Sequence, residues 1–277
     1  GIGRGGPWGS VRGMRVHADE DGGEQREDVG LDEGDQDLEQ HDAIHPLRLR
    51  VGRRQFRDDL AGDGALQAAE WVASGQGPVA FHIAGGMHHA HKSSASGFCY
   101  INDPVIGIMR LLSRGKRVAY IDIDAHHGDG VQRAFYETNR VLTISLHETG
   151  HTLFPGTGFE HEIGVGEGEG YAVNLPFPPD TDDDVYVWAF DEVVPELIRA
   201  FQPDIVVTQL GVDTFYDDPI TNLRLSIFGY EKVLRRVKEL APRWVALGGG
   251  GYNISNVARA WTLAWAIMNG IDLRDEL

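Results

Sequence analysis

Residues 122–129, Asp-Ile-Asp-Ala-His-His-Gly-Asp, directly follow the apolar run 118–121 and constrain the fold more than any other stretch. Ionisable side chains behind a short apolar strand are typical of an open α/β sheet, which carries its chemistry at the carboxyl ends of its strands. Side chains two residues apart point to the same side of extended backbone, so Asp124 and His126 can face one ion. An oxygen and a nitrogen donor suit Zn²⁺ and other first-row metals better than Ca²⁺. The alternative, a plain polar turn, would leave these groups costly to bury.

Short apolar runs alternate with helical patterns from residue 63 onward. This alternation predicts a three-layer α/β fold with a mostly parallel central sheet and helices on both faces. The expected strands are 79–83, 118–123, 141–146, 171–175, 205–210 and 244–247. The expected helices are 65–72, 103–114 with Asp103 as its cap, 130–136, 183–201 with a bend or break near Pro195, 227–240 and 254–269.

Residues 1–58 differ in character from the rest of the chain. They are rich in Gly, Asp, Glu, Gln and Arg and show neither strand nor helix periodicity. Such a segment buries too little apolar surface to offset the entropy of ordering. We expect a low-complexity acidic and basic segment that is either disordered or outside the natural reading frame of the gene. One α/β domain is expected over 59–277.

Composition restricts the compartment and the partners. A sole cysteine, Cys99, allows neither an internal disulfide nor a thiolate zinc cluster, which is typical of a cytoplasmic protein. No apolar run reaches the roughly 20 residues of a membrane span. Residues 19–42 carry −11 of the net charge of −17, so the remainder is only mildly acidic. It lacks the basic surface that direct nucleic-acid binding requires. The oligomeric state stays open.

Glycine-rich or polar loops follow four of the expected strands. These loops are 85–89 (Gly-Gly-Met-His-His), 122–129, 211–213 (Gly-Val-Asp) and 248–252 (Gly-Gly-Gly-Gly-Tyr). Glycine at a strand end lets the backbone approach a ligand closely. Because the carboxyl ends of parallel strands meet at one edge of a sheet, we expect the four loops to converge on one pocket.

These motifs together resemble the zinc-dependent histone deacetylase family, most closely its bacterial branch that includes the acetoin-utilisation proteins. They come in the family's order and cover about residues 60–277. The matching motifs are 85–90, 96–103 (Ser-Gly-Phe-Cys-Tyr-Ile-Asn-Asp), 120–130, 145–147 (Ser-Leu-His), 154–158 (Phe-Pro-Gly-Thr-Gly), 209–213 and 248–253. The resemblance implies an arginase/deacetylase-like fold and a deacetylase-like catalytic domain over 59–277.

The resemblance implies a zinc-dependent deacetylase, an amide hydrolase acting on linear C–N bonds. One Zn²⁺ would be held by Asp124, His126 and Asp213, with open positions for water and the acyl carbonyl. The other implied catalytic residues have separate roles. His89 is the general base and then acid, His88 acts electrostatically, Asp122 and Asp129 orient the two histidines, and Tyr252 stabilises the oxyanion.

The family also implies substrate contacts and potassium sites. Gly97, Phe98 and Phe154 match the walls of an acyl-lysine channel, and Ile220 matches the position of an acidic gatekeeper in polyamine enzymes. The implied inner K⁺ site comprises Asp122, Asp124, His126, Ser145 and Leu146. The implied outer K⁺ site comprises Phe135, Thr138, Val141 and Ala172. His127, His147 and His151 are left with structural roles.

The chain departs from the family at both ends. The family's usual first strand is replaced by 1–58, and the final helices are absent, so we expect an incomplete sheet and a partial catalytic domain. Two alternative functions stay open: an arginase-like hydrolase with two Mn²⁺, and a non-catalytic acyl-amine binding protein. The expected substrate is an acetylated protein lysine or a small acylated amine, and Ile220 disfavours polyamines.

Overall fold

The fold is given by a computed structural model that describes residues 55–273. Most of the segment expected over 1–58 therefore lies outside the described residues; its last four residues begin the first helix. The helices are α1 (Gln55–Ala73), α2 (Asp103–Ser113), α3 (Asp129–Phe135), α4 (Asp183–Phe201), α5 (Ile227–Leu240) and α6 (Ile254–Asn269). The strands are β1 (Val79–His82), β2 (Val118–Asp122), β3 (Val141–Glu148), β4 (Ala172–Phe177), β5 (Ile205–Gln209) and β6 (Trp244–Leu247).

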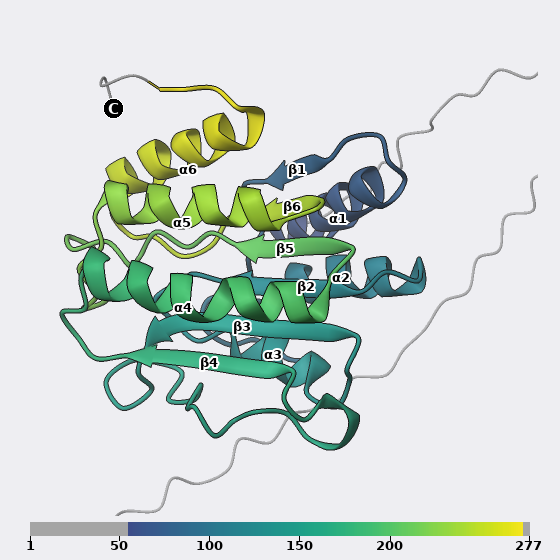
Figure 1. The fold of residues 1–277 in the computed structure, drawn as a ribbon, viewed down its shortest axis with the longest axis horizontal. Coiled ribbons are helices and arrows are strands. Elements are labelled where there is room, and N and C mark those ends of the chain that lie inside the picture. The colour runs from purple at the N-terminus through teal and green to yellow at the C-terminus, as the bar shows by residue number, and fades with distance from the viewer. Residues whose placement is uncertain (1–54, 274–277) are drawn as a thin grey trace, which may run out of the picture. The chain divides into compact units, whose positions relative to one another are not determined.

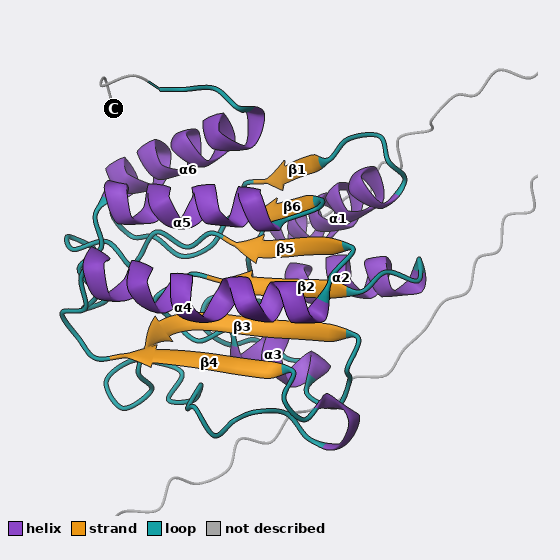
Figure 2. Cartoon of the chain, viewed as in Figure 1, coloured by secondary structure: helices purple, strands orange, loops and turns teal. Residues whose placement is uncertain are grey.

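The six strands form one sheet in the order β1-β6-β5-β2-β3-β4 (Figures 1 and 2). Each neighbouring pair of these strands is parallel. The three-layer α/β prediction is confirmed, and the described sheet is wholly rather than mostly parallel. In Figure 2 the arrowheads point one way, so the strands deliver their following loops to one edge.

Two apolar cores lie on opposite faces of the sheet because successive strand residues point to opposite sides. Ala119 and Ile121 of β2 pack with α4, α5 and α6 on one face. Val118 and Tyr120 of the same strand pack with α1, α2 and α3 on the other. Figure 1 shows α4 and α5 in front of the sheet and α1, α2 and α3 behind it. A strand buried on both faces reads as a continuous apolar run, as seen in the sequence.

Side-chain caps set where several helices begin. The caps of α4, α5 and α6 are Asp182, Ser226 and Asn253, each accepting a backbone N–H of the first turn. The prediction that Asp103 caps α2 is wrong by one residue. Asn102 is the cap, with its side chain accepting from the Val105 N–H, and Asp103 is the first helical residue. The Asp103 carboxylate is thereby free to bind elsewhere.

Helix α4 runs without interruption from Asp183 to Phe201 through Pro195, so of the predicted bend or break the break is excluded. Its apolar face packs on the sheet along its whole length, with Phe190, Val194 and Ile198 in the core. This packing offsets the backbone hydrogen bond that a proline removes. Neither α4 nor any other helix of residues 55–273 is long and apolar enough to cross a membrane.

The burial of α4 predicts unequal effects of two neighbouring truncations. Phe190 is fully buried, whereas Trp188 on the same helix is 64% exposed. Phe190→Ala should lower the free energy of unfolding by about 3–5 kcal/mol, because it removes buried contacts and leaves a cavity. Trp188→Ala should change it by less than about 0.5 kcal/mol. Denaturant unfolding measures both, and equal losses would contradict the packing described.

Candidate active site

Loops from four strands meet at the carboxyl edge of the sheet, as expected. They follow β1, β2, β5 and β6. The chemical side chains that these loops bring together are His88, His89, Asp124, His126, Asp213 and Tyr252. Residues separated by more than 160 positions thus share one site, which only the parallel topology makes possible.

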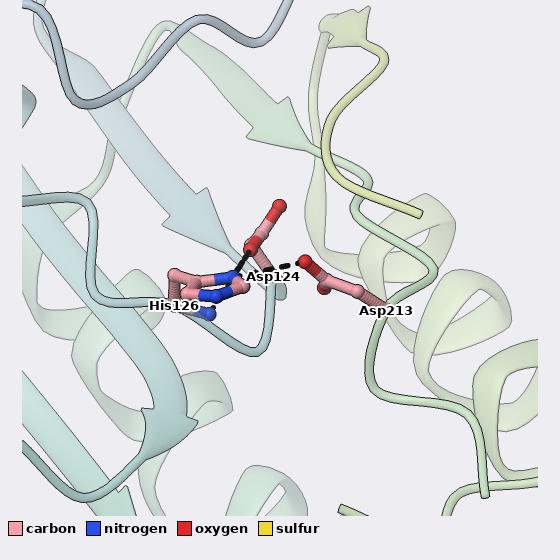
Figure 3. A group of neighbouring side chains, drawn as sticks. All are labelled: Asp124, His126 and Asp213. Atoms are coloured by element: carbon pink, nitrogen blue, oxygen red, sulfur yellow. Dashed lines mark hydrogen bonds and ion pairs between the residues drawn. The ribbon is translucent and has the colours of Figure 1, made fainter. Parts of the chain in front are cut away.

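Asp124, His126 and Asp213 form the centre of this site (Figure 3). Oδ1 of Asp124 and Oδ2 of Asp213 each lie 3.0 Å from Nδ1 of His126. All three residues are buried. One donor atom from each residue therefore faces a common point.

The second oxygens of both carboxylates are held by other groups. Asp124 Oδ2 accepts from the Gln209 side-chain amide at 2.6 Å and from the Gly250 N–H at 2.8 Å. Asp213 Oδ1 accepts from the Ala125 N–H at 2.8 Å. Only one oxygen of each carboxylate is left to face His126. Such anchoring fixes ligand orientation around a metal.

The donor set fits a divalent first-row cation. Two buried carboxylates facing one another repel, and burial together with the Asp124 charge raises the pKa of Asp213. A bound cation would relieve that repulsion. Two oxygens and one imidazole nitrogen are a three-ligand set of the kind that leaves a catalytic zinc open to substrate. These residues are therefore well suited to hold a metal ion.

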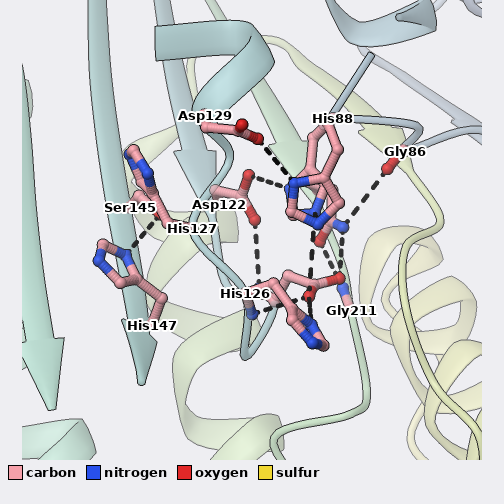
Figure 4. Close-up of polar contacts among 12 residues, drawn as sticks. Gly86, His88, Asp122, His126, His127, Asp129, Ser145, His147 and Gly211 are labelled. Atoms are coloured by element: carbon pink, nitrogen blue, oxygen red, sulfur yellow. Dashed lines mark hydrogen bonds and ion pairs between the residues drawn. The ribbon is translucent and has the colours of Figure 1, made fainter. Parts of the chain in front are cut away.

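A pair of histidine–aspartate contacts lies beside the metal-ligand set (Figure 4). His88 Nδ1 is 2.7 Å from Asp122 Oδ2, and His89 Nδ1 is 2.7 Å from Asp129 Oδ1. The two Nε2 atoms are 3.0 Å apart. Asp122 and Asp129 thus lie behind His88 and His89 in the order that the sequence predicted.

The two histidines differ in protonation. Burial lowers the pKa of His88, but the Asp122 and Asp124 carboxylates outweigh it and raise the value to about 9. Burial and the nearby charge of His88 lower the pKa of His89 to about 4. At neutral pH His88 is therefore protonated and His89 stays neutral. A neutral imidazole can accept a proton, which a general base must do.

The site opens into a cavity of about 1180 Å³ lined by both histidines, by Asp124 and His126, and by Phe98 and Tyr252. The Phe98 and Tyr252 rings lie 6.3 Å apart. Gly97 also lines the cavity. The Phe154 ring stands edge-on to His89 at 5.0 Å. Aromatic side chains therefore surround the approach to the metal ligands.

Tyr252 is positioned through its backbone. Asp218 accepts the N–H of Tyr252 at 2.9 Å and, with its other oxygen, the N–H of Ile220 at 3.0 Å. Burial and the nearby carboxylates of Asp124 and Asp213 raise the pKa of the Tyr252 hydroxyl. The hydroxyl is therefore protonated at neutral pH and can donate. Asp218 places Ile220 near the same loop, although Ile220 is not among the residues that line the cavity.

Two histidines for which the sequence predicts only structural roles hold the loop that carries Phe154. His147 lies between Ser145 Oγ at 2.8 Å and the Gly158 carbonyl at 2.9 Å. His127 Nδ1 is 2.8 Å from Thr157 Oγ1. Both imidazoles are almost fully buried. His127 follows β2 and His147 lies near the end of β3, but their partners belong to a distant loop, so the contacts that give them this structural role could not be predicted from the sequence.

The residues expected to bind potassium form two groups. Asp122 and Ser145 are register partners at the carboxyl ends of β2 and β3, and Leu146 follows in β3. The outer group comprises Phe135, Thr138, Val141 and Ala172, where α3 ends and β3 and β4 begin. Within it the Thr138 N–H donates to the Phe135 carbonyl at 3.2 Å.

Comparisons with known proteins agree with this geometry. The sequence model of the histone deacetylase domain matches residues 54–268. The acetoin utilization protein AcuC of Bacillus subtilis is 45% identical over 234 residues, which is 82% of this chain and 60% of that protein. Human histone deacetylase 1 is 45% identical over 218 residues, 79% of this chain and 45% of that protein.

A solved structure shows the same similarity to histone deacetylases. The histone deacetylase homologue of Aquifex aeolicus matches with a TM-score of 0.74 and 43% identity, over 78% of this chain and 58% of that one. This chain therefore spans between 45% and 60% of the length of these three relatives.

The metal-ligand set predicts a stability change on binding. Zinc at a hundredfold excess over its dissociation constant should add about 2.7 kcal/mol to the free energy of unfolding. Asp213→Asn should abolish most of that gain, since an amide binds zinc weakly. Asp180→Asn, at a residue that is 75% exposed in its side chain and does not belong to the set, is the matched control. Thermal unfolding with and without zinc measures both; an equal shift in Asp213→Asn would contradict the site.

Proposed function

Since the chain belongs to the histone deacetylase family, we propose that it hydrolyses the acyl amide of an acetylated lysine or of a small acylated amine, using one zinc ion. The observation that carries the proposal is one cavity lined by Asp124 and His126, by the paired histidines and by Tyr252, with Asp213 completing the buried Asp–His–Asp set. In this proposal Asp124, His126 and Asp213 hold the zinc. When bound, zinc supplies Lewis acidity toward the acyl carbonyl and lowers the pKa of water.

The protein's own residues perform the proton transfers. His89, neutral at pH 7, takes the proton of the attacking water at Nε2, while the Asp129 carboxylate holds its Nδ1–H. It then returns the proton to the nitrogen of the leaving amine. Cationic His88 stabilises negative charge as it develops, with Asp122 behind it. The Tyr252 hydroxyl donates to the oxyanion.

One metal ion is favoured over the two of an arginase-like hydrolase. A second ion requires further free carboxylates. Asp129, the nearest candidate in sequence, has Oδ1 on His89 at 2.7 Å and Oδ2 within 3.2 Å of His91. Within residues 55–273 the clustered metal-ligating groups consist of the one set already described.

Potassium is part of the proposal. The inner site would use Asp122, Asp124, His126, Ser145 and Leu146, and the outer site Phe135, Thr138, Val141 and Ala172. Support for the inner site is chemical, because a monovalent cation would offset the buried charge of Asp122. Support for the outer site is the grouping of its residues where α3 ends and β3 and β4 begin.

Substrate selection rests on the residues around the opening. Gly97, Phe98 and Phe154 would line the passage for the apolar acyl-lysine stem. Ile220 is 45% exposed and offers no charge to attract a polyamine. We therefore favour an acetylated lysine over an acetylpolyamine.

The test of this function is turnover by the zinc-loaded chain on acetyl-lysine peptides, longer acyl-lysine peptides and acetylpolyamines. We expect acetyl-lysine peptides to be hydrolysed fastest and His89→Ala to lose activity by at least about 10²-fold, as expected for a lost general base. His151→Ala, at an exposed histidine, is the matched control and should retain activity. Zinc bound without turnover on any substrate would reject hydrolysis and leave the non-catalytic binding protein.

Tyr252→Phe should lower kcat by about 10²–10³ and leave KM within about threefold, since the lost donor acts on the oxyanion and not on the ground state. Tyr216→Phe, at a residue 63% exposed in the loop after β5, should leave both constants unchanged. Steady-state kinetics with one acetyl-lysine peptide measures the pair. An equal fall in kcat for the two variants would contradict the assigned role.

A further inference from the structure

The loop that carries His88 and His89 has little regular structure of its own. Residues 83–102 connect β1 to α2 without a helix or strand. A general base must be held within a fraction of an ångström of its working position. The carboxylates of Asp122 and Asp129 orient the two rings, but they do not hold the backbone that carries them. The backbone therefore needs separate support.

The first residue of α2 supplies part of that support. The Asp103 carboxylate accepts the Gly86 N–H at 2.9 Å to Oδ2 and 3.1 Å to Oδ1, and the Met87 N–H at 2.8 Å to Oδ1. Asp103 is fully buried. These amides immediately precede His88, so the carboxylate fixes the chain where it enters the histidine pair.

Asn102, the cap residue of α2, hydrogen-bonds to the same loop. The Asn102 side-chain amide donates to the His88 carbonyl at 3.1 Å and to the Ala90 carbonyl at 2.9 Å. Its oxygen meanwhile accepts the Val105 N–H at 3.1 Å and so begins the helix. One side chain thus ties the active loop to the start of a helix.

Asp103 is charged at a cost to stability. Burial raises the pKa of its carboxyl to about 6, although the Met87 and Gly86 N–H groups lower it. A carboxyl whose pKa is higher in the folded than in the unfolded chain stabilises the fold below its unfolded pKa, near 4. That contribution is lost as the pH rises through about 6. At neutral pH the charge therefore works against folding, which is typical of groups kept for function.

We propose that Asn102 and Asp103 are positioning residues for hydrolysis: together they clamp the loop 86–90 and so place the His88–His89 pair against the metal ligands. Neither side chain hydrogen-bonds to the histidine rings, and both act through the backbone. The inference rests on the proposed function for its effect on turnover. The clamp itself rests only on the hydrogen bonds.

Asp103→Ala tests the carboxylate, because alanine removes both oxygens that accept the Gly86 and Met87 N–H groups. It should lower kcat by about tenfold or more and leave KM within about twofold, because the pair moves while Phe154 and Tyr252, which other loops carry, do not. Bound zinc should stay at one ion per chain. Backbone amide exchange supplies a readout that needs no activity, with the protection of Gly86 and Met87 falling at least about tenfold.

Asn102→Asp tests the hydrogen bonds that the Asn102 amide donates, without removing the helix cap. Aspartate keeps the oxygen that accepts the Val105 N–H but has no N–H to give to His88 and Ala90. We expect kcat to fall with little change in KM, and helix content to be retained. Asn102→Ala would remove the cap as well, which makes it the poorer variant.

Asp183→Ala is the matched control. Asp183 is the first residue of α4 and, like Asp103, accepts a backbone N–H from another segment, that of Ser226 at 2.8 Å. This variant should expose the Ser226 amide to exchange and lower the thermal midpoint. It should leave kcat and the protection of Gly86 and Met87 unchanged.

The outcomes separate the clamp from the proposed function. Loss of protection at Gly86 and Met87 with a selective fall in kcat supports the clamp. Unchanged protection in Asp103→Ala overturns it, as does a fall in kcat no larger than that of Asp183→Ala. If the unaltered chain has no turnover, the proposed function fails, and amide exchange alone still supports or overturns the clamp.

Discussion

The interaction on which the site depends is the buried approach of two carboxylates and one imidazole to a single point. Asp124 and Asp213 would repel each other in a dry interior unless a cation were shared between them. Their outer oxygens are taken by Gln209, by Gly250 and by the Ala125 N–H, which leaves one oxygen of each to face His126. The parallel sheet makes this arrangement possible because it brings the loops after β2, β5 and β6 to one edge.

The charge of this centre extends into the histidine pair. Asp124 contributes to raising the pKa of His88, and the resulting cation helps to lower the pKa of His89. Two adjacent residues of the same type thereby acquire opposite protonation states from their surroundings. This is how neighbouring groups take separate acid and base roles at one pH. The division supports the proposal that His89 transfers protons and His88 gives electrostatic support.

Most of the fold could be predicted from the sequence, because strands buried on both faces leave continuous apolar runs between helical patterns. The elements agree to within a few residues, except that α1 begins at Gln55, ten residues before the expected start. The cap of α2 was misplaced by one residue, since Asn and Asp stand side by side and both can cap. Of the bend or break expected at Pro195, the break does not occur, because packing of α4 on the sheet outweighs the local preference of proline. The spacing of Asp124 and His126 after a strand indicated candidate metal ligands. No such spacing indicated the roles of Gln209, His127 and His147, since their partners come from distant loops.

The central claim is that one metal ion at Asp124, His126 and Asp213 supports hydrolysis by the neighbouring histidines. The most direct measurement is a titration of metal-free chain with zinc, following bound zinc and the initial rate of acetyl-lysine peptide hydrolysis together. If one ion supports hydrolysis, the rate rises in proportion to bound zinc and reaches its plateau at one ion per chain. A rate that needs two ions per chain, or that is independent of bound zinc, would contradict it.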